Sequence, residues 1–172
     1  RLRITFDNRP NIQSGVVQIY DQATNGLVDS VNVAGDTDTI GYSGQSNART
    51  LNIKPAVVLD KTISISPHAG RLTYGKTYRV VIGNGVFSGT LNGGAYTGAS
   101  GNQWTFTTKS SGPTGTTVTV DDDGPADFSS LQGALNYVTR SVGRDTPAQI
   151  HVRNGIYPEV LFLRDKNNLR VI

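Results

Sequence analysis

The chain has 172 residues, a formal net charge of +3, 20 glycines, and neither cysteine nor methionine. Its length is enough for one or two domains with a substantial core, and the lack of cysteine excludes disulfides and Cys-ligated metals. The 16 Lys and Arg residues form no basic run, so we expect no nucleic-acid partner. No apolar stretch approaches the roughly 18 residues of a membrane span, and no signal peptide is visible. Few charges and abundant glycine favour β structure with many turns.

Apolar and polar residues alternate with period two through much of residues 1–109. Such alternation puts one face of each strand into a core and the other into water, which is typical of antiparallel sheets. No window has a comparable 3.6-residue period, so we expect two packed sheets. The alternating core-facing residues are Leu2, Ile4 and Phe6; Val17 and Ile19; Leu51 and Ile53; Ile63 and Ile65; Tyr78, Val80 and Ile82; and Trp104 and Phe106.

Two features refine this expectation. Turn residues from Ser66 to Gly75 precede Tyr78, and a tyrosine at such a corner can return its hydroxyl to the backbone, as in immunoglobulin-like sandwiches. Gly83 to Asn102 is rich in Gly, Asn and Ser, and we expect it to be a loop too polar to bury that joins the last two strands.

A family resemblance is carried by the sequence TLNIKPAVVLDKTISISPHAGRLTYGKTYRVVIGNGVF, which closes with WTFTTK. It resembles the bacterial immunoglobulin-like domain that precedes catalytic domains of secreted and surface proteins. The resemblance covers most of Leu2 to Thr108 and rests on strand patterning, the L-x-x-G-x-x-Y motif of Leu72, Gly75 and Tyr78, and the terminal T-F-T-T. It implies an immunoglobulin-like β-sandwich over residues 1–109 and a secreted or cell-surface location.

Candidate binding residues in this part have mostly structural explanations. Trp104 keeps the inward phase of Phe106, which favours a core position over a sugar-stacking platform. His68 lies in a Pro-containing turn with no Cys, Asp or second His nearby in the sequence, so we expect no metal there. The tyrosines that could stack on a sugar ring are Tyr42, Tyr74 and Tyr96.

Residues 110–117, SSGPTGTT, are typical of an interdomain linker. Beyond them, Val118 and Val120 predict a short strand. Ser129 is expected to cap a helix with Gln132 three residues on, in a capping box. The helix then has one apolar stripe, made of Leu131, Ala134, Leu135 and Val138.

The pattern after the helix predicts three strands, at Ile150 and Val152, at Val160 to Leu163 and at Leu169 to Ile172. Short turns between them would allow a meander. A helix that feeds strands at this spacing also fits a parallel β-helix, in which each coil buries its face only when the next coil stacks on it.

A second resemblance is carried by TVDDDGPADFSSLQGALNYV, AQIHVRNGIYPEVLFL and NNLRVI in residues 118–172, which look like the opening of the catalytic domain of pectin methylesterases. The family has a glycine before Asp127, where this chain has Ala126 preceded by Pro125. The resemblance implies the capping helix and first coil or coils of a right-handed parallel β-helix. The matching positions are Asp123-Gly124, Asp127-Phe128, Ser129 to Val138, and the G-x-Y-x-E motif of Gly155, Tyr157 and Glu159.

The pectin methylesterase resemblance implies hydrolysis of methyl esters of polygalacturonate. The family uses an Asp nucleophile, an Asp acid/base, Gln side chains at the oxyanion and an Arg beside the nucleophile. These residues belong to later coils, so we assign no catalytic, cofactor-binding or metal residue and no cofactor to this chain, and expect it to be inactive alone. The absence of Met and the start within a strand suggest an excerpt of a longer protein.

Other acidic and histidine residues are expected to be structural. Asp121 to Asp123 fail the calcium-loop template, which favours a solvated turn. Glu159 follows Pro158 at an expected strand start, and we expect it to hold a turn or coil edge and to take no part in chemistry. His151 has an outward phase and no visible Ser or Asp partner, which disfavours a catalytic dyad.

Two other functions stay open from the sequence. The chain could belong to a surface adhesin or carbohydrate-binding protein whose β-helix is purely structural, or to another pectin-degrading enzyme, a lyase or a glycosidase. The expected partner is pectin, bound by a downstream domain. The open β-helix end could also self-associate, because Leu161, Leu163 and Ile172 need apolar partners on a following coil or on another molecule.

Overall fold

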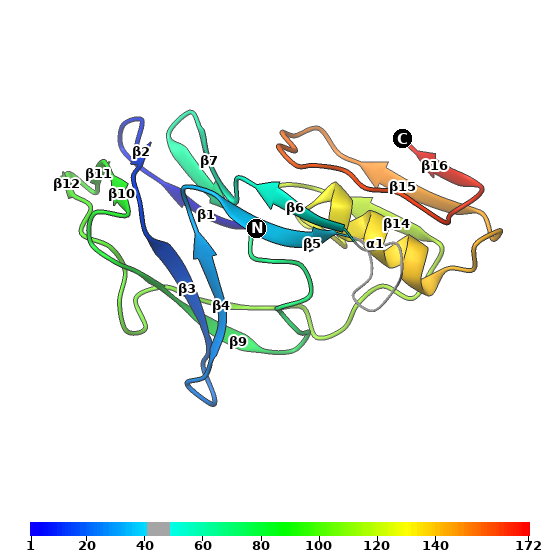
Figure 1. Ribbon diagram of the computed structural model, residues 1–172, viewed down its shortest axis with the longest axis horizontal. Helices are drawn as coiled ribbons and strands as arrows, with labels where there is room; N and C mark the ends of the chain where they lie inside the picture. The colour runs from blue at the N-terminus through cyan, green and yellow to red at the C-terminus, as the bar shows by residue number, and fades with distance from the viewer. Residues whose placement is uncertain (41–48) are drawn as a thin grey trace. The chain divides into compact units, whose positions relative to one another are not determined.

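The computed structural model describes residues 1–40 and 49–172 of the chain (Figure 1). The fold is mainly β, as the sequence predicts, with α1 (Leu131–Ser141) as the only helix among the described residues. The chain divides into two compact units. Unit 1 comprises Arg1–Asp38 and Asn52–Ser111, and unit 2 comprises Thr39–Leu51 and Gly112–Ile172.

The larger sheet of unit 1 is antiparallel, with strand order β13-β9-β3-β4, and β3, β4 and β9 lie side by side in Figure 1. Alternate residues are buried, for example Val80 and Ile82, whereas Val81 between them is half-buried. The predicted alternation is therefore confirmed here. The strands are β3 (Val16–Asp21), β4 (Leu27–Asn32), β9 (Thr77–Ile82) and β13 (Thr105–Thr107).

A second antiparallel sheet has the order β1-β8-β7. Its register aligns Leu2 with Ile65 and Ile4 with Ile63, so aliphatic side chains lie on one face. Side chains of both sheets join one hydrophobic core. The strands of this sheet are β1 (Leu2–Thr5), β7 (Ala56–Leu59) and β8 (Thr62–Ile65). Three further sheets have two strands each: β2 (Asn11–Ile12) with β10 (Phe87–Ser88), β11 (Thr90–Leu91) with β12 (Gly94–Ala95), and β5 (Asp36–Ile40) with β6 (Arg49–Ile53).

Tyr78 is buried, and its hydroxyl accepts a hydrogen bond from the backbone N–H of Thr73 at 2.9 Å. The prediction that Tyr78 returns its hydroxyl to the backbone is therefore confirmed. The expectation that residues 83–102 are too polar to bury is wrong for Val86 and Phe87, which belong to the core. Room for Val86 exists because Gly15 lacks a side chain: a Cβ there would lie 2.7 Å from Val86 Cγ2.

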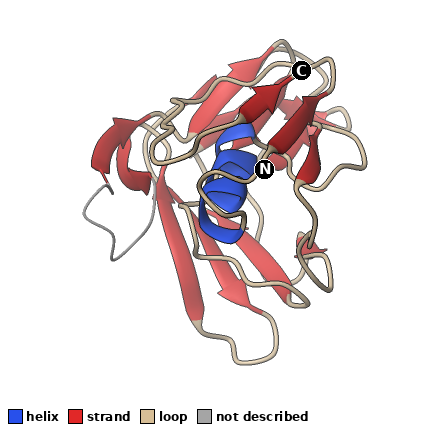
Figure 2. Cartoon of the chain, turned by 90° about the vertical axis from the view of Figure 1, so that its right-hand side faces the viewer, coloured by secondary structure: helices blue, strands red, loops and turns tan. Residues whose placement is uncertain are grey.

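Unit 2 contains three strands that pair in parallel, in the order β14-β15-β16. The parallel pairing excludes the meander alternative. Helix α1, the blue helix of Figure 2, connects β14 to β15 along the chain. It contacts both strands, and its buried residues are Ala134, Leu135 and Val138. The strands are β14 (Thr117–Val120), β15 (Ala148–Val152) and β16 (Leu169–Val171).

Two expectations for unit 2 are wrong in detail. The N-cap of α1 is Ser130 and not Ser129, because Ser130 has the extended conformation that lets its hydroxyl accept from Gly133 N–H. Residues 160–163 form no strand; the side chain of Gln132, a residue of α1, makes hydrogen bonds to the backbone of Phe162 and holds this segment on the helix. Within residues 1–40 and 49–172, no helix has the length and apolar character needed to cross a membrane.

Candidate functional site

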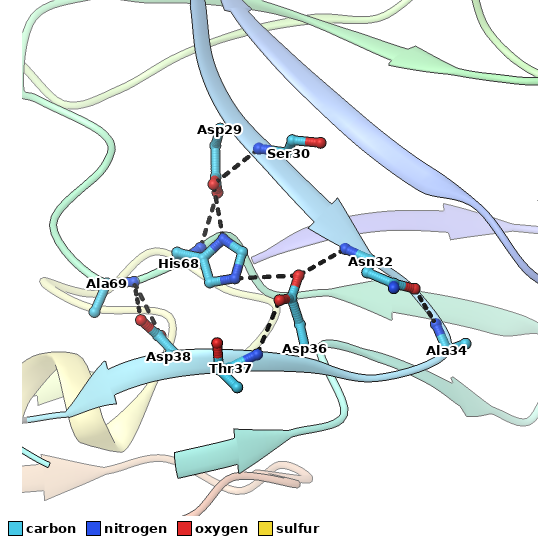
Figure 3. A network of polar contacts seen from close by, with 9 residues as sticks. All are labelled: Asp29, Ser30, Asn32, Ala34, Asp36, Thr37, Asp38, His68 and Ala69. Atoms are coloured by element: carbon cyan, nitrogen blue, oxygen red, sulfur yellow. Dashed lines mark hydrogen bonds and ion pairs between the residues drawn. The ribbon is translucent and has the colours of Figure 1, made fainter. Parts of the chain in front are cut away.

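A partly buried cluster in unit 1 places one histidine between carboxylates from two strands (Figure 3). His68 lies in the turn after β8, Asp29 in β4 and Asp36 at the start of β5. His68 Nδ1 is 2.7 Å from Asp29 Oδ1, and Nε2 is 3.3 Å from Asp36 Oδ2. The side chains of His68, Asp29 and Asp36 are 13%, 3% and 23% exposed. Local sequence patterns do not predict this cluster, because His68 is far along the chain from Asp29 and Asp36 and only the folded strands bring the three residues together.

Asp29, Asp36 and the nearby Asp38 also accept hydrogen bonds from backbone N–H groups. Asp29 accepts hydrogen bonds from the N–H groups of Ser30 and His68, and Asp38 accepts from the N–H of Ala69 at 3.0 Å. Asp36 accepts from the N–H groups of Asn32 and Thr37, both at 2.8 Å. The cluster therefore fastens the turn around His68 to β4 and β5 through side chains and backbone together (Figure 3).

The charges around the imidazole determine its protonation. Burial alone would lower the pKa of His68, but the hydrogen bond and charge of Asp29 and the charges of Asp36 and Asp38 outweigh it and raise that pKa. Burial opposes ionisation of Asp36, whereas the N–H groups of Asn32 and Thr37 and the nearby His68 lower its pKa. Both imidazole nitrogens face carboxylates, so the ring has no nitrogen directed at a substrate. This arrangement suits a structural ion cluster better than acid–base catalysis.

The acidic turn of unit 2 is more buried than the sequence suggests. Asp121 and Asp122 are buried, so the expectation of a solvated turn is wrong for them, and only Asp123 is exposed. Asp121 Oδ1 accepts from the N–H groups of Asp123 and Gly124, and the Asp123 bond is the largest cause that lowers the pKa of Asp121. Each of the three carboxylates has an oxygen within 4.8 Å of the others. The two backbone hydrogen bonds to Asp121 are those of an Asx-type turn.

Each residue of the G-x-Y-x-E motif makes a specific contact with another part of unit 2. A Cβ on residue 155 would lie 2.2 Å from Asp122 Oδ1, so a side chain at this position would displace the Asp122 carboxylate. The Tyr157 hydroxyl donates to the carbonyl of Arg153 at 2.9 Å. The Glu159 carboxylate accepts from the first two backbone N–H groups of α1 at 3.0 and 2.9 Å. Glu159 therefore holds the start of a helix, where the sequence predicted a turn or coil edge, and no strand begins at this residue.

The side chain of Gln132 fixes the segment that follows Glu159. Its Oε1 accepts from the N–H of Phe162 at 2.7 Å, and its Nε2 donates to the carbonyl of Phe162 at 3.1 Å and to Asn136 Oδ1 at 2.8 Å. The amide thus pairs with one backbone residue as a β-strand would. Gln132 is not the capping-box partner that the sequence predicts.

The aromatic candidates for sugar binding have different surroundings. Trp104 packs against the core of unit 1, and Tyr96 packs edge-on against Phe6 at 5.3 Å. Burial raises the pKa of Tyr96 to about 12. Tyr74 is 50% exposed, and Tyr42 lies outside the described residues.

His151, the second histidine of the chain, lies on β15. Its Nε2 is 3.3 Å from Gln149 Oε1 on the same strand, so the contact is local. The comparisons with known proteins give no assignment for either histidine or for the acidic turn: no family model, no curated protein and no solved structure matches this chain.

Proposed function

We propose that this chain is the N-terminal part of a secreted pectinesterase, a carboxylic ester hydrolase that acts on methyl esters of polygalacturonate. In this proposal an immunoglobulin-like β-sandwich, residues 1–109, precedes the capping helix and first coil of a right-handed parallel β-helix in residues 118–172. The observation that carries the proposal is the set of contacts made by the pectin-methylesterase-like residues. Gly155, Tyr157 and Glu159 each have a specific packing or hydrogen-bonding role around one helix and one parallel ladder.

The parallel ladder supports the β-helix part of the proposal. Val118, Ile150 and Val171 are in register across β14, β15 and β16, which makes a column of aliphatic side chains. Val118 and Ile150 are fully buried, whereas Val171 is 48% exposed. In a stacked-coil fold each new coil adds one residue to such a column and buries the previous one. Val171 is the position that a further coil would cover.

The opposite edge of the ladder is closed, which supports a capping role for the residues before the helix. Phe128 forms a parallel bridge with Val120 of β14. Asp127 Oδ2 accepts hydrogen bonds from the backbone N–H and the hydroxyl of Thr119, at 2.8 and 2.9 Å. These contacts occupy the outer edge of β14 at Thr119 and Val120, which disfavours addition of a strand there.

Features of unit 1 support the accessory-domain part of the proposal. Two antiparallel sheets share one core, and Tyr78 returns its hydroxyl to Thr73 at the corner before β9. An accessory domain of this kind needs no chemistry of its own. The proposed ester hydrolysis is assigned to coils that follow residue 172, and pectin is the partner of that downstream domain.

The assay that tests the proposal uses the full product of the gene and the 172-residue chain on highly methylated pectin. We expect the full product to release methanol, with unmethylated polygalacturonate as the control. Unsaturated uronides without methanol would identify a lyase, and new reducing ends without methanol a glycosidase. Retention on pectin without any product would identify a binding protein or adhesin. Each of these three outcomes would replace the esterase proposal.

A further inference from the structure

We propose that His68 is a proton-operated clamp in unit 1, which bridges Asp29 of β4 and Asp36 of β5 as an imidazolium and releases Asp36 as a neutral imidazole. This proposal does not depend on the pectinesterase proposal. It rests on the position of the ring between two carboxylates that come from different strands (Figure 3).

The clamp needs two N–H donors on one ring. An imidazolium has an N–H on each nitrogen, whereas a neutral imidazole has only one, so the neutral ring can donate to one carboxylate only. The contact to Asp29 is the shorter, at 2.7 Å against 3.3 Å for Asp36, and Asp29 is the more buried carboxylate. Leaving a buried carboxylate without its donor is the costlier choice. The remaining proton therefore stays on Nδ1, and the lone pair of Nε2 then faces Asp36 Oδ2.

Release of Asp36 affects the turn between β4 and β5. Asp36 Oδ2 is also the acceptor for the N–H of Asn32, the last residue of β4. Repulsion between this oxygen and the Nε2 lone pair weakens both contacts at the same atom. The effect is local, because Asp29 still holds the His68 backbone N–H and Asp38 still holds the Ala69 N–H.

The charged groups around the imidazole set the direction of the pH dependence. Asp29 of β4 and Asp36 and Asp38 of β5 all carry negative charge and favour the imidazolium. The pKa of His68 is raised above its ordinary 6.5, so its stabilising contribution is complete below pH 6.5 and is lost as the pH rises through the raised value. The pKa of Asp36 is lowered below its ordinary 3.8, so its contribution is complete above pH 3.8 and is lost as the pH falls through the lowered value. The clamp is closed between these two limits.

Titration of His68 by NMR in the His151→Gln variant tests the clamp directly. The chain has two histidines, so this variant leaves His68 as the only imidazole. We expect His68 to titrate above pH 6.5 and the amide signal of Asn32 to move with the same midpoint. A midpoint at or below the ordinary value, or an Asn32 amide that does not follow it, would overturn the proposal.

Thermal unfolding of unit 1 within the full chain gives the second test, with His151→Gln as the matched control for His68→Gln. Between about pH 5.5 and about pH 8.5, the melting temperatures of the wild type and of His151→Gln should fall by roughly 2–4 °C, whereas that of His68→Gln should change much less. The same fall in His68→Gln would contradict the clamp. If His68→Gln does not fold, Asp36→Asn in the His151→Gln background should lower the titration midpoint of His68, and an unchanged midpoint would overturn the proposal.

Discussion

Glu159 Oε1 lies 3.0 Å from the backbone nitrogen of Leu131, the first residue of α1. The other oxygen of this carboxylate accepts from the N–H of Gln132. The first turn of α1 has no acidic residue of its own, so Glu159, the only glutamate of the chain, brings negative charge to the positive end of the helix from 28 residues away. The last residue of the G-x-Y-x-E motif thereby connects the segment after β15 to the start of α1.

Replacing Glu159 by Ala should destabilise unit 2 by about 1–2 kcal/mol, because two N–H groups at the helix start lose their acceptor and the helix loses a favourable charge. Glu159→Gln should cost less, since the amide oxygen still accepts one bond. Denaturant unfolding measures the loss of stability in each variant, and amide exchange at Leu131 and Gln132 shows whether the start of α1 has opened. The exposed Arg164→Gln serves as the control. Unchanged exchange at Leu131 in Glu159→Ala would show that the carboxylate does not hold α1.

Gly155→Ala should lower the unfolding free energy by roughly 1–3 kcal/mol, because the new methyl group would overlap the Asp122 carboxylate. Gly115→Ala is the matched control, since its methyl group would have no neighbour nearer than 3.9 Å. In a double-mutant cycle, Gly155→Ala should cost less in an Asp122→Ala background. An equal loss of unfolding free energy in the two backgrounds would show that the Asp122 carboxylate is not the source of the overlap.

Tyr78→Phe should destabilise unit 1 by about 1 kcal/mol, because the backbone N–H of Thr73 loses a buried acceptor. The ring itself stays, so its stacking on Phe106 at 5.4 Å should persist. Tyr74→Phe, at a half-exposed tyrosine, should have little effect. Comparable denaturation midpoints for Tyr78→Phe and the wild type would contradict a stabilising role for this hydrogen bond.

The purified 172-residue chain should release no methanol from methylated pectin, because our proposal assigns the catalytic residues to later coils. A sensitive coupled methanol assay, with a commercial pectinesterase as the positive control, measures this. Methanol release at a rate proportional to the concentration of the chain would mean that catalytic residues are present within residues 1–172.

The periodicity of apolar residues correctly predicted strand β9 and the buried face of α1. Alternation at Val80 and Ile82 placed β9, and the apolar stripe of Ala134, Leu135 and Val138 placed the buried face of α1. The choice between the adjacent Ser129 and Ser130 as N-cap could not be made in this way. It depends on the backbone conformation of Ser130, which is extended and lets the hydroxyl accept from the N–H of Gly133.

Long-range contacts account for the other differences. Val160 to Leu163 has the composition of a strand, but Gln132 pairs with the Phe162 backbone and keeps this segment on α1. His68 has no acidic neighbour in the sequence and acquires Asp29 and Asp36 only when β4 and β5 form. A charged cluster of this kind leaves no periodic signal.

Amide exchange at β16 tests the central proposal, that unit 2 is the beginning of a parallel β-helix. Ile172 N–H donates to Ile150 and its carbonyl accepts from Val152, so the alternation of a parallel ladder directs the N–H groups of Leu169 and Val171 to the outer edge. In a monomeric sample of the 172-residue chain these two amides should exchange far faster than that of Val80, and in the longer gene product they should become protected. Protection at Leu169 and Val171 equal to that of Val80 in the monomeric chain, or fast exchange that persists in the longer product, would contradict it.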